Sequence, residues 1–410
     1  MVVKAKQKPK RRSSSARAKI GLALAGGGPE GAIYEIGAIR ALEEAVEGLD
    51  LNDLDIYIGV SAGAFIAANL ANQLTTAQMC RAIVKTEPGE HPFVPETFLT
   101  PAVGELLKRG TDIPGLLLSV FRDLARYPGD ASVLDSLTRL ARALPVGLFR
   151  NEPIREYLAK IYSIKGRSDD FRKLSRSLIV VAADLESGRE VLFGEPGFDD
   201  VPISRAVQAS SALPGLYPPV EIAGRYYVDG VLLKTLHASV ALEKGADLVL
   251  CINPIVPVDT LHAVEKGEME NGDLVRRGLP SVMSQTFRTL IHSRLEIGLK
   301  TYAERYPRAD VVLIEPERDD YRMFFSNIFR FSARRLVADH AYRATRRDLL
   351  RRREQLEPIL ARHGLRLRTE ILADESRDLW SSVSLHAATS SAEVVRDMDA
   401  ALNRLEALLR

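Results

Sequence analysis

The strongest constraint on this 410-residue chain is a serine, Ser61, that stands between Gly59 and Gly63. Residues 55–58 before it are typical of a short buried strand, and residues 64–70 after it are apolar and alanine-rich, which indicates a helix. Glycine is needed on both sides because a tight turn from strand to helix leaves no room for a Cβ atom. Such a turn exposes the serine hydroxyl at the positive end of the helix. The sequence therefore predicts an α/β fold with a nucleophile elbow at Ser61.

A second strand and a glycine-rich loop lie near the start of the chain. Residues 20–25 are apolar and lead into a loop that contains Gly26, Gly27, Gly28 and Gly31, and helical spacing of apolar residues follows. Backbone N–H groups in such a loop, next to a helix N-terminus, bind negative charge. The loop fits either a phosphate site, because three of its glycines satisfy G-x-G-x-x-G, or an oxyanion hole. A dinucleotide site needs an acidic residue at the end of the second strand, where this chain has the serine elbow, and this favours the oxyanion hole.

The serine needs a group that accepts its proton. Histidine is the commonest choice, and seven are present: His91, His237, His262, His292, His340, His363 and His386. None of them lies in a short strand-end loop flanked by small residues, although a histidine triad stays open as an alternative. By contrast, residues 226–229 are typical of a strand that ends on Asp229, and Gly230 follows. This pattern places a carboxylate at a strand end.

Together these motifs resemble those of the patatin-like phospholipases. The glycine loop, the Ser61 elbow and Asp229-Gly230 occur in the order and approximate spacing of that family. Residues 210–220 resemble the loop that precedes the aspartate strand in bacterial members, and residues 245–250 resemble the strand that follows it. The resemblance covers about residues 18–255. It implies a three-layer α/β/α core with a mostly parallel sheet.

The resemblance also implies an activity, a serine lipid acyl hydrolase that uses a Ser61–Asp229 catalytic dyad and needs neither a histidine nor a cofactor. The substrate would be a lipid ester. The resemblance also gives the glycines three roles. Gly26, Gly27 and Gly28 would form the oxyanion hole, Gly59 and Gly63 the nucleophile elbow, and Gly31 and Gly230 would support the site.

The chain departs from the family pattern in the oxyanion loop. The family usually has Gly-Gly-Gly-x-Arg/Lys-Gly, whereas Pro29 and Glu30 fill the two variable places here. Pro29 removes one N–H donor. Glu30 either opposes the oxyanion or turns outward to pair with Arg40 or another base. These changes leave the dyad intact, but they motivate an alternative, a weak or inactive patatin-fold protein that binds a lipid or a partner.

Two smaller departures follow the aspartate. Val231 stands where the family favours a second glycine, and Lys234-Thr235 stands where Asn-Pro is common. No spacing of histidines and acidic residues indicates a metal site. Cys80 and Cys251 are far apart, which predicts buried free thiols.

Charge is concentrated in residues 1–19, which carry eight basic and no acidic side chains. This basic tail is expected to be disordered, and it either makes peripheral contact with an anionic membrane or is a solvated leader with no specific partner. It lacks the apolar segment of a signal peptide, and no apolar run is long enough to span a bilayer. We therefore expect a cytoplasmic or peripherally bound protein. Nucleic-acid binding is not expected because aromatic residues and a binding motif are not evident beside the arginines.

The predicted organisation has four parts. The basic tail covers residues 1–19, and the catalytic core covers 20–255 with a helical insert at about 85–176. Residues 256–345 complete the core with helices near 285–305 and 326–353 and an edge strand at 311–316, and residues 346–410 form a helical extension. Within the insert, residues 111–121 are expected to form an apolar helix that is either a lid or a packed helix. Arginines between 343 and 368 are expected on a solvated helix face, and the oligomeric state is not fixed by the sequence.

Overall fold

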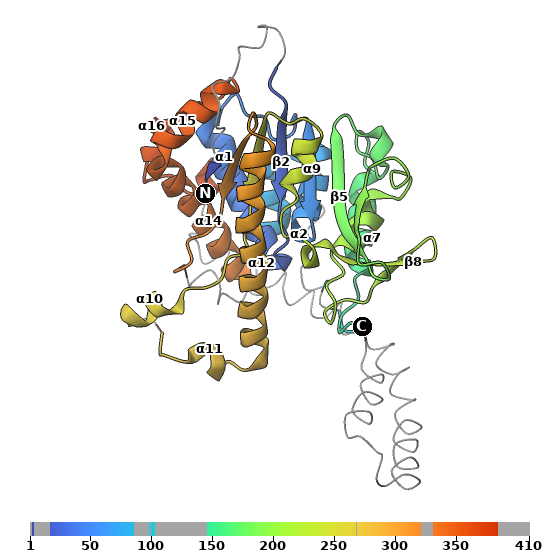
Figure 1. Ribbon diagram of the computed structural model, residues 1–410. Helices are drawn as coiled ribbons and strands as arrows, with labels where there is room; N and C mark the ends of the chain where they lie inside the picture. Colours follow the sequence, from blue (N-terminus) through green and yellow to red (C-terminus); the bar gives the residue numbers. More distant parts are fainter. Residues whose placement is uncertain are drawn as a thin grey trace, which may run out of the picture.

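A nine-stranded mixed sheet forms the centre of the protein in the computed structural model, which describes residues 2–3, 17–85, 98, 100–102, 146–267, 269–320 and 331–383 (Figure 1). The strand order is β1-β10-β9-β2-β4-β5-β8-β7, and β6 pairs with residues 180–183 of β5. The strands are β1 (Val2–Val3), β2 (Ile20–Leu24), β4 (Ile56–Val60), β5 (Ser177–Asp184), β6 (Glu190–Phe193), β7 (Val220–Ile222), β8 (Arg225–Asp229), β9 (Leu248–Ile252) and β10 (Asp310–Ile314). A separate antiparallel pair joins β3 (Val46–Glu47) to β11 (Arg366–Leu367).

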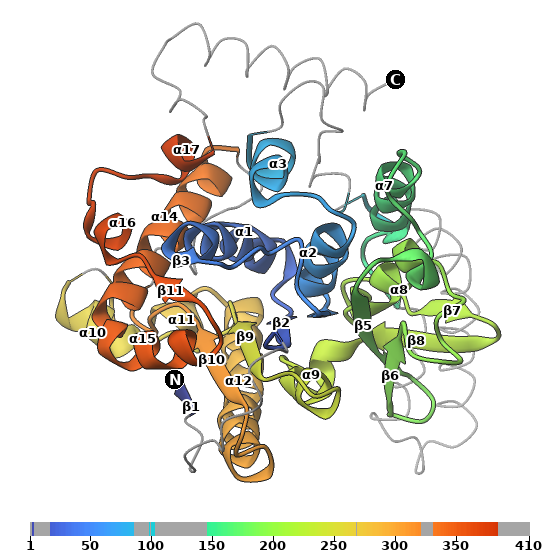
Figure 2. The same ribbon diagram turned by 90° about the horizontal axis from the view of Figure 1, so that it is seen from above.

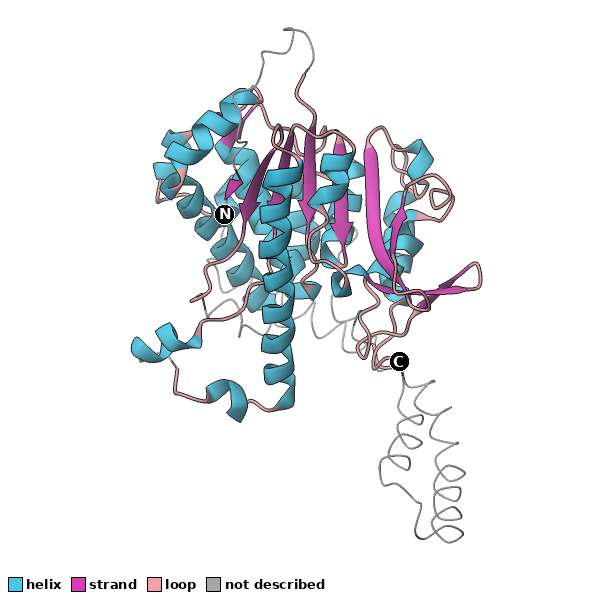
Figure 3. Ribbon diagram, in the orientation of Figure 1, coloured by secondary structure: helices cyan, strands magenta, loops and turns pink. Residues whose placement is uncertain are grey.

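The five central strands β10, β9, β2, β4 and β5 are parallel neighbours. Figure 3 shows the central arrows pointing to the same edge of the sheet, which is therefore its carboxyl edge. Every residue of β2, β4, β9 and β10 is buried, as expected where helices cover both faces of a parallel sheet. β6 and β8 pair antiparallel with β5, and β7 pairs antiparallel with β8. These three strands extend the sheet beyond β5.

Helices cover both faces of the sheet, so the fold has three layers, as the sequence predicts (Figure 2). One face carries α1 (Gly28–Ala45), α2 (Ala62–Ala71), α7 (Glu152–Tyr162), α8 (Ile203–Ser210) and α14 (Phe331–Arg351). The other face carries α9 (Ala238–Glu243) and the long helix α12 (Leu279–Arg305). Alternate side chains of a strand enter the two cores: Leu22 and Leu24 of β2 pack toward α1, and Ala23 packs toward α9.

Shorter helices complete the described residues. They are α3 (Thr76–Met79), α10 (Thr260–Glu265), α11 (Asp273–Arg276), α15 (Arg353–Arg362), α16 (Thr369–Ala373) and α17 (Leu379–Ser382). In addition, η1 (Cys80–Lys85) is a π-helix, and η3 (Phe171–Lys173) and η4 (Gly230–Leu232) are 3₁₀-helices. Among the described residues, no helix has both the length and the apolar character needed to cross a bilayer.

The C-terminal helices pack on the core. A Cβ atom at Gly37 of α1 would lie 2.3 Å from the carbonyl oxygen of Ala338, so glycine lets α1 and α14 approach closely. The expectation of a solvated arginine face is wrong for Arg346 of α14, which is buried. The segment from α16 to α17 folds back over it, and its guanidinium donates to the carbonyls of Arg377 and Asp374.

Several expectations fall on parts of the chain that are not described. They are most of the basic tail (1 and 4–16), the apolar segment at 111–121 within the insert, and residues 384–410. Val2 and Val3 differ from the expected disorder, since this apolar pair forms β1 and takes the sheet edge outside β10. Cys80 and Cys251 are buried and free, which confirms the prediction. The domain boundaries remain predictions.

Candidate active site

The turn between β4 and α2 holds Ser61 in a conformation that few residues adopt. Its φ is 54° and its ψ is −121°, a region unfavourable for a residue with a Cβ atom. A Cβ atom at Gly59 would lie 2.4 Å from the Cα of Ala64, and one at Gly63 would lie 2.5 Å from the backbone of Leu24. Both glycines are therefore required by the close approach of the turn to its own helix and to β2.

Asp229 ends β8 and meets Ser61 in the structure. Its side chain is 1% exposed, and its Oδ1 accepts a 2.9 Å hydrogen bond from the N–H of Val231. Burial raises the pKa of Asp229 to about 7, while the hydrogen bonds from Val231 and from the Ser61 hydroxyl oppose the rise. A Cβ atom at Gly230 would lie 2.7 Å from the carbonyl oxygen of Val181, which explains the glycine after the aspartate.

The glycine loop passes beside the serine. A Cβ atom at Gly26 would lie 3.2 Å from the Cβ of Ser61. Gly27 is the N-cap of α1, and its carbonyl accepts the first helical hydrogen bond, 3.0 Å from the N–H of Gly31. Gly28 opens the helix with a φ of 60°. The first N–H groups of a helix have no partner inside it, so the loop presents donors at the positive end of α1 near Ser61.

The two departures in this loop have structural explanations. Pro29 lies in the first turn of α1, where its missing N–H removes no helical hydrogen bond. Glu30 lies 3.7 Å from Arg288 of α12. Burial raises the pKa of Glu30 to about 7, and the positive charge of Arg288 partly offsets the rise. Arg40, the partner considered from sequence, pairs instead with Glu43 at 2.6 Å.

A residue that sequence reasoning did not single out, Ser210, holds the elbow in place. Its hydroxyl accepts a 2.8 Å hydrogen bond from the N–H of Ser61 and donates a 2.6 Å hydrogen bond to the carbonyl of Val181. Ser210 ends α8 and is fully buried. The only sequence signal was its position at the start of the segment that resembles the loop before the aspartate strand of the family.

A cavity of about 630 Å³ opens beside Ser61 and Asp229. Its size is within the range of small-molecule sites. Apart from Arg288, Arg334 and the site residues, the wall is mainly apolar, and it includes Ile33, Phe65, Phe98, Ile154, Leu213, Leu216, Val231, Met283, Phe287 and Ile291. Such a wall suits an acyl chain.

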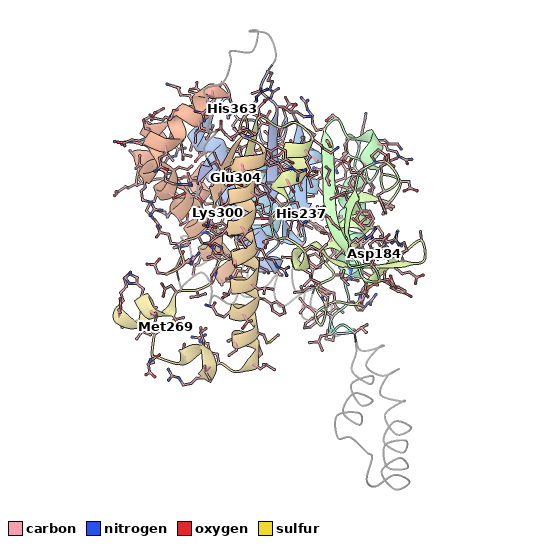
Figure 4. All side chains as sticks on the ribbon, viewed as in Figure 1. Asp184, His237, Met269, Lys300, Glu304 and His363 are labelled. Atoms are coloured by element: carbon pink, nitrogen blue, oxygen red, sulfur yellow. The ribbon has the colours of Figure 1, made fainter. Side chains whose placement is uncertain are left out.

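No histidine is among the described residues that line this cavity. His237 lies 2.8 Å from Glu190, and His363 lies 2.8 Å from Asp310. Figure 4 labels both histidines and shows them at different parts of the fold. In the described part of the chain, no group of histidine, cysteine and acidic side chains is arranged to hold a metal ion. Among the described residues that line the cavity, Asp229 is the carboxylate that lies within hydrogen-bond reach of Ser61.

Comparison with known proteins identifies the family. The model of the patatin-like phospholipases matches residues 22–242, more than half of the chain, and the chain belongs to this family. A curated relative, a probable lipid hydrolase of Invertebrate iridescent virus 6, is 22% identical over 228 residues. That match covers 54% of this chain and 63% of the relative, so the chain spans less than two thirds of the relative's length.

Two solved structures are also similar. VipD from Legionella pneumophila is 13% identical with a TM-score of 0.32, and the match covers 90% of this chain and 82% of VipD. ExoU from Pseudomonas aeruginosa, solved in complex with SpcU, is 17% identical with a TM-score of 0.28. That match covers 72% of this chain and 54% of ExoU.

Proposed function

We propose that this protein is a serine carboxylic ester hydrolase that acts on lipid acyl esters, with Ser61 as nucleophile and Asp229 as base. The observation that carries this proposal is the contact between the Ser61 hydroxyl and the buried carboxylate of Asp229 at the wall of an apolar cavity. Membership of the patatin-like phospholipases supports it.

In the first step, the Oγ atom of Ser61 attacks the ester carbonyl and Asp229 takes the hydroxyl proton. Burial favours this transfer, because a carboxylate with a pKa of about 7 is a stronger base than an ordinary one. The carbonyl oxygen becomes negative and is stabilised by N–H groups of the loop that includes Gly26 and Gly28. The partial positive charge at the N-terminus of α1 adds to this stabilisation.

In the second step, the tetrahedral intermediate collapses and the protonated Asp229 gives its proton to the leaving alcohol. The acyl group is then an ester of Ser61. Asp229 takes a proton from a water molecule, and the resulting hydroxide attacks the acyl-enzyme carbonyl at the same oxyanion site. Collapse releases the fatty acid, and Ser61 recovers its proton from Asp229. The apolar cavity holds the acyl chain during both steps.

One observation favours a second function, a lipid-binding protein with little catalysis. Glu30 places a carboxylate on the first turn of α1, where a negative charge opposes an oxyanion. Two features reduce this effect. Arg288 lies 3.7 Å away, and burial favours the neutral form of Glu30 below a pH of about 7.

A fluorophosphonate probe, which reacts covalently with activated serines, tests the proposal. Native protein should label, Ser61→Ala should not, and Asp229→Asn should label at least a hundredfold more slowly. Ser211→Ala is the matched control, because Ser211 also lines the cavity and has no part in the proposed mechanism. Folded native protein that does not label would favour the lipid-binding alternative. Replacement of each histidine in turn should leave labelling intact, whereas loss with any one of them would favour a histidine triad.

A further inference from the structure

The N-terminal half of α12 carries a row of exposed apolar side chains. They occupy positions i, i+3, i+4, i+8 and i+11 and so share one side of the helix: Leu279, Val282, Met283, Phe287 and Leu290. We call this set the α12 stripe. More than half of the large apolar side chains that are exposed in the described residues lie on the segment from α10 to α12. An apolar patch of this kind marks an interaction surface.

The α12 stripe is continuous with the mouth of the candidate active site. Met283 and Phe287 belong to the stripe and also line the cavity beside Ser61. The adjacent side of the same helix, with Ser284, Arg288 and Ile291, forms cavity wall. Leu213 and Leu232, which come from other parts of the chain, are also exposed and line the cavity. Apolar side chains are therefore present both on the exposed stripe and along the wall that leads to the site.

The position of α12 makes the stripe accessible to a flat surface. Its N-terminal half extends beyond the carboxyl edge of the sheet, and α10 and α11 lie beside this protruding end (Figure 1). Lys300 and Glu304, labelled in Figure 4, mark the other half of α12, which covers the sheet. The apolar half of the helix is thus the half that projects from the body of the protein.

The charges around the stripe fit an anionic partner. Residues 274–295 contain four arginines and no acidic residue, and one of the four, Arg288, lies in the cavity wall near Glu30. Arg294 is exposed and donates a 3.0 Å hydrogen bond to the carbonyl of Leu232 at the cavity mouth. Arg276 and Arg277 of the preceding turn form ion pairs with Glu270 and Asp273, so the arginine at the mouth is the more relevant charge.

We propose that the α12 stripe is the surface by which this protein docks on a lipid bilayer, with the cavity mouth facing the membrane. This inference rests on the proposed function in one respect, that the cavity takes acyl chains from a membrane lipid. A chain that leaves a bilayer through an apolar contact avoids exposure to water, which costs about 0.8 kcal/mol for each CH₂ group. Arg294 and its neighbours would then lie at the level of anionic head groups.

The test measures binding of Ser61→Ala protein to vesicles of phosphatidylcholine and phosphatidylglycerol, so that hydrolysis does not alter the membrane. Replacement of Leu279 and Leu290 by glutamate removes two stripe residues that do not line the cavity. In this background, we expect the double variant to lower the vesicle partition constant about tenfold or more, because two leucine side chains are no longer transferred from water into the bilayer. In protein with Ser61 intact, Leu279→Glu/Leu290→Glu should leave hydrolysis of a short soluble ester unchanged.

Leu185→Glu is the matched control. Leu185 is 50% exposed, against 51% for Leu290, and follows Asp184, which Figure 4 places on the side of the sheet away from α10 and α11. This variant should bind vesicles as well as its parent does. Binding should also persist in high salt, because salt screens charges and leaves apolar contact in place.

Three results would overturn the docking surface. The first is an absence of vesicle binding by folded protein. The second is undiminished binding by Leu279→Glu/Leu290→Glu, and complete loss in high salt would then assign the binding to the basic tail. The third is a native dimer in light scattering that this double variant converts to a monomer, which would assign the stripe to a second copy of the chain. Fluorophosphonate labelling without vesicle binding refutes this inference alone, and stripe-dependent binding without labelling refutes the proposed function alone.

Discussion

The backbone N–H of Ser61 donates a 2.8 Å hydrogen bond to the hydroxyl of Ser210, which itself donates to the carbonyl of Val181 on the neighbouring strand β5. Because Ser61 has a positive φ, its backbone conformation is strained and needs support from outside the turn. Ser210 supplies that support and connects the elbow to the strand that pairs with both β4 and β8. The orientation of the proposed nucleophile thus depends on a residue 149 positions away in the sequence.

Ser210→Ala should reduce kcat about tenfold and leave the KM for a short soluble ester nearly unchanged. The alanine leaves the N–H of Ser61 and the carbonyl of Val181 buried without a partner, which costs about 1–3 kcal/mol of stability. Kinetics and urea unfolding on the same preparation measure both effects. Ser211→Ala, one residue along, is the control and should change neither. A kcat equal to that of native protein would show that the elbow keeps its geometry without Ser210.

The rate of hydrolysis should depend on the ionisation of Asp229. Because burial raises its pKa to about 7, kcat/KM should rise about tenfold per pH unit below 7 and become level above it. A pH profile of kcat/KM with a soluble ester measures the pKa of the essential group in the free enzyme. An apparent pKa near 4 would mean that Asp229 is not the base.

Glu30 also has a pKa of about 7, so the profile alone does not distinguish the two carboxyl groups. Glu30→Gln removes its titration and keeps a side chain of the same size beside Arg288. The variant should retain the rise near pH 7, with equal or higher activity above it, because the oxyanion no longer faces a negative neighbour. A profile that becomes flat in Glu30→Gln would assign the titration to Glu30.

The same raised pKa predicts that the buried carboxylate of Asp229 destabilises the fold at neutral pH. The folded-state pKa of Asp229 lies above the ordinary value of 3.8, so its stability contribution is full below that value and is lost as the pH rises to about 7. Asp229→Asn should therefore match native protein near pH 4 and be more stable by about 2 kcal/mol or more at pH 8. Urea unfolding at the two pH values measures the difference.

Asp184 is the control of opposite sign. Hydrogen bonds from Ser187 hold its pKa below the usual value, so its stability contribution is present at neutral pH and is lost in acid. Asp184→Asn should destabilise the protein at pH 8. If both variants shift stability in the same direction at pH 8, the changes reflect packing rather than ionisation.

The central part of the fold was predictable from sequence because its signals are local. Continuous apolar runs indicated β2, β4, β5, β9 and β10, and the structure has each of them within a few residues. A strand with both faces buried needs no alternation, and this makes it visible as a short apolar run. The burial of Arg346 was not visible, because it depends on carbonyls that α16 and α17 bring back over α14.

The residues of the candidate site were predictable where the local backbone geometry requires one particular residue type. Glycines that flank a serine, and an aspartate that ends a strand, are local patterns, and the structure brings Ser61, Asp229 and the glycine loop together. The roles assigned to these residues remain predictions.

The contacts that adjust the site were not predictable in the same way. Arg288 reaches Glu30 from a helix about 260 residues later in the chain, and no periodic pattern records such a pairing. Ser210 is one of several serines and is distinguished only by its position in space. The α12 stripe has helical spacing, but its exposure follows from the projection of the helix beyond the sheet.

Two glycines beside the proposed nucleophile should respond differently to the same change. In Gly63→Ala the new Cβ would lie 2.5 Å from backbone atoms of Leu24 and Ala25, which cannot move without distorting β2. We expect a loss of more than about 3 kcal/mol of stability, as for other severe steric conflicts.

In Gly26→Ala the new Cβ would lie 3.1 Å from a methyl of Val231 and 3.2 Å from the Cβ of Ser61, and side chains can yield by a few tenths of an ångström. Stability should fall by about 1 kcal/mol, within the usual range for a tight fit. Fluorophosphonate labelling should fall much further, because the methyl group would stand where the oxyanion forms. Urea unfolding and labelling rates on both variants test this contrast, and a Gly26→Ala protein that labels at the native rate would place the oxyanion away from Gly26.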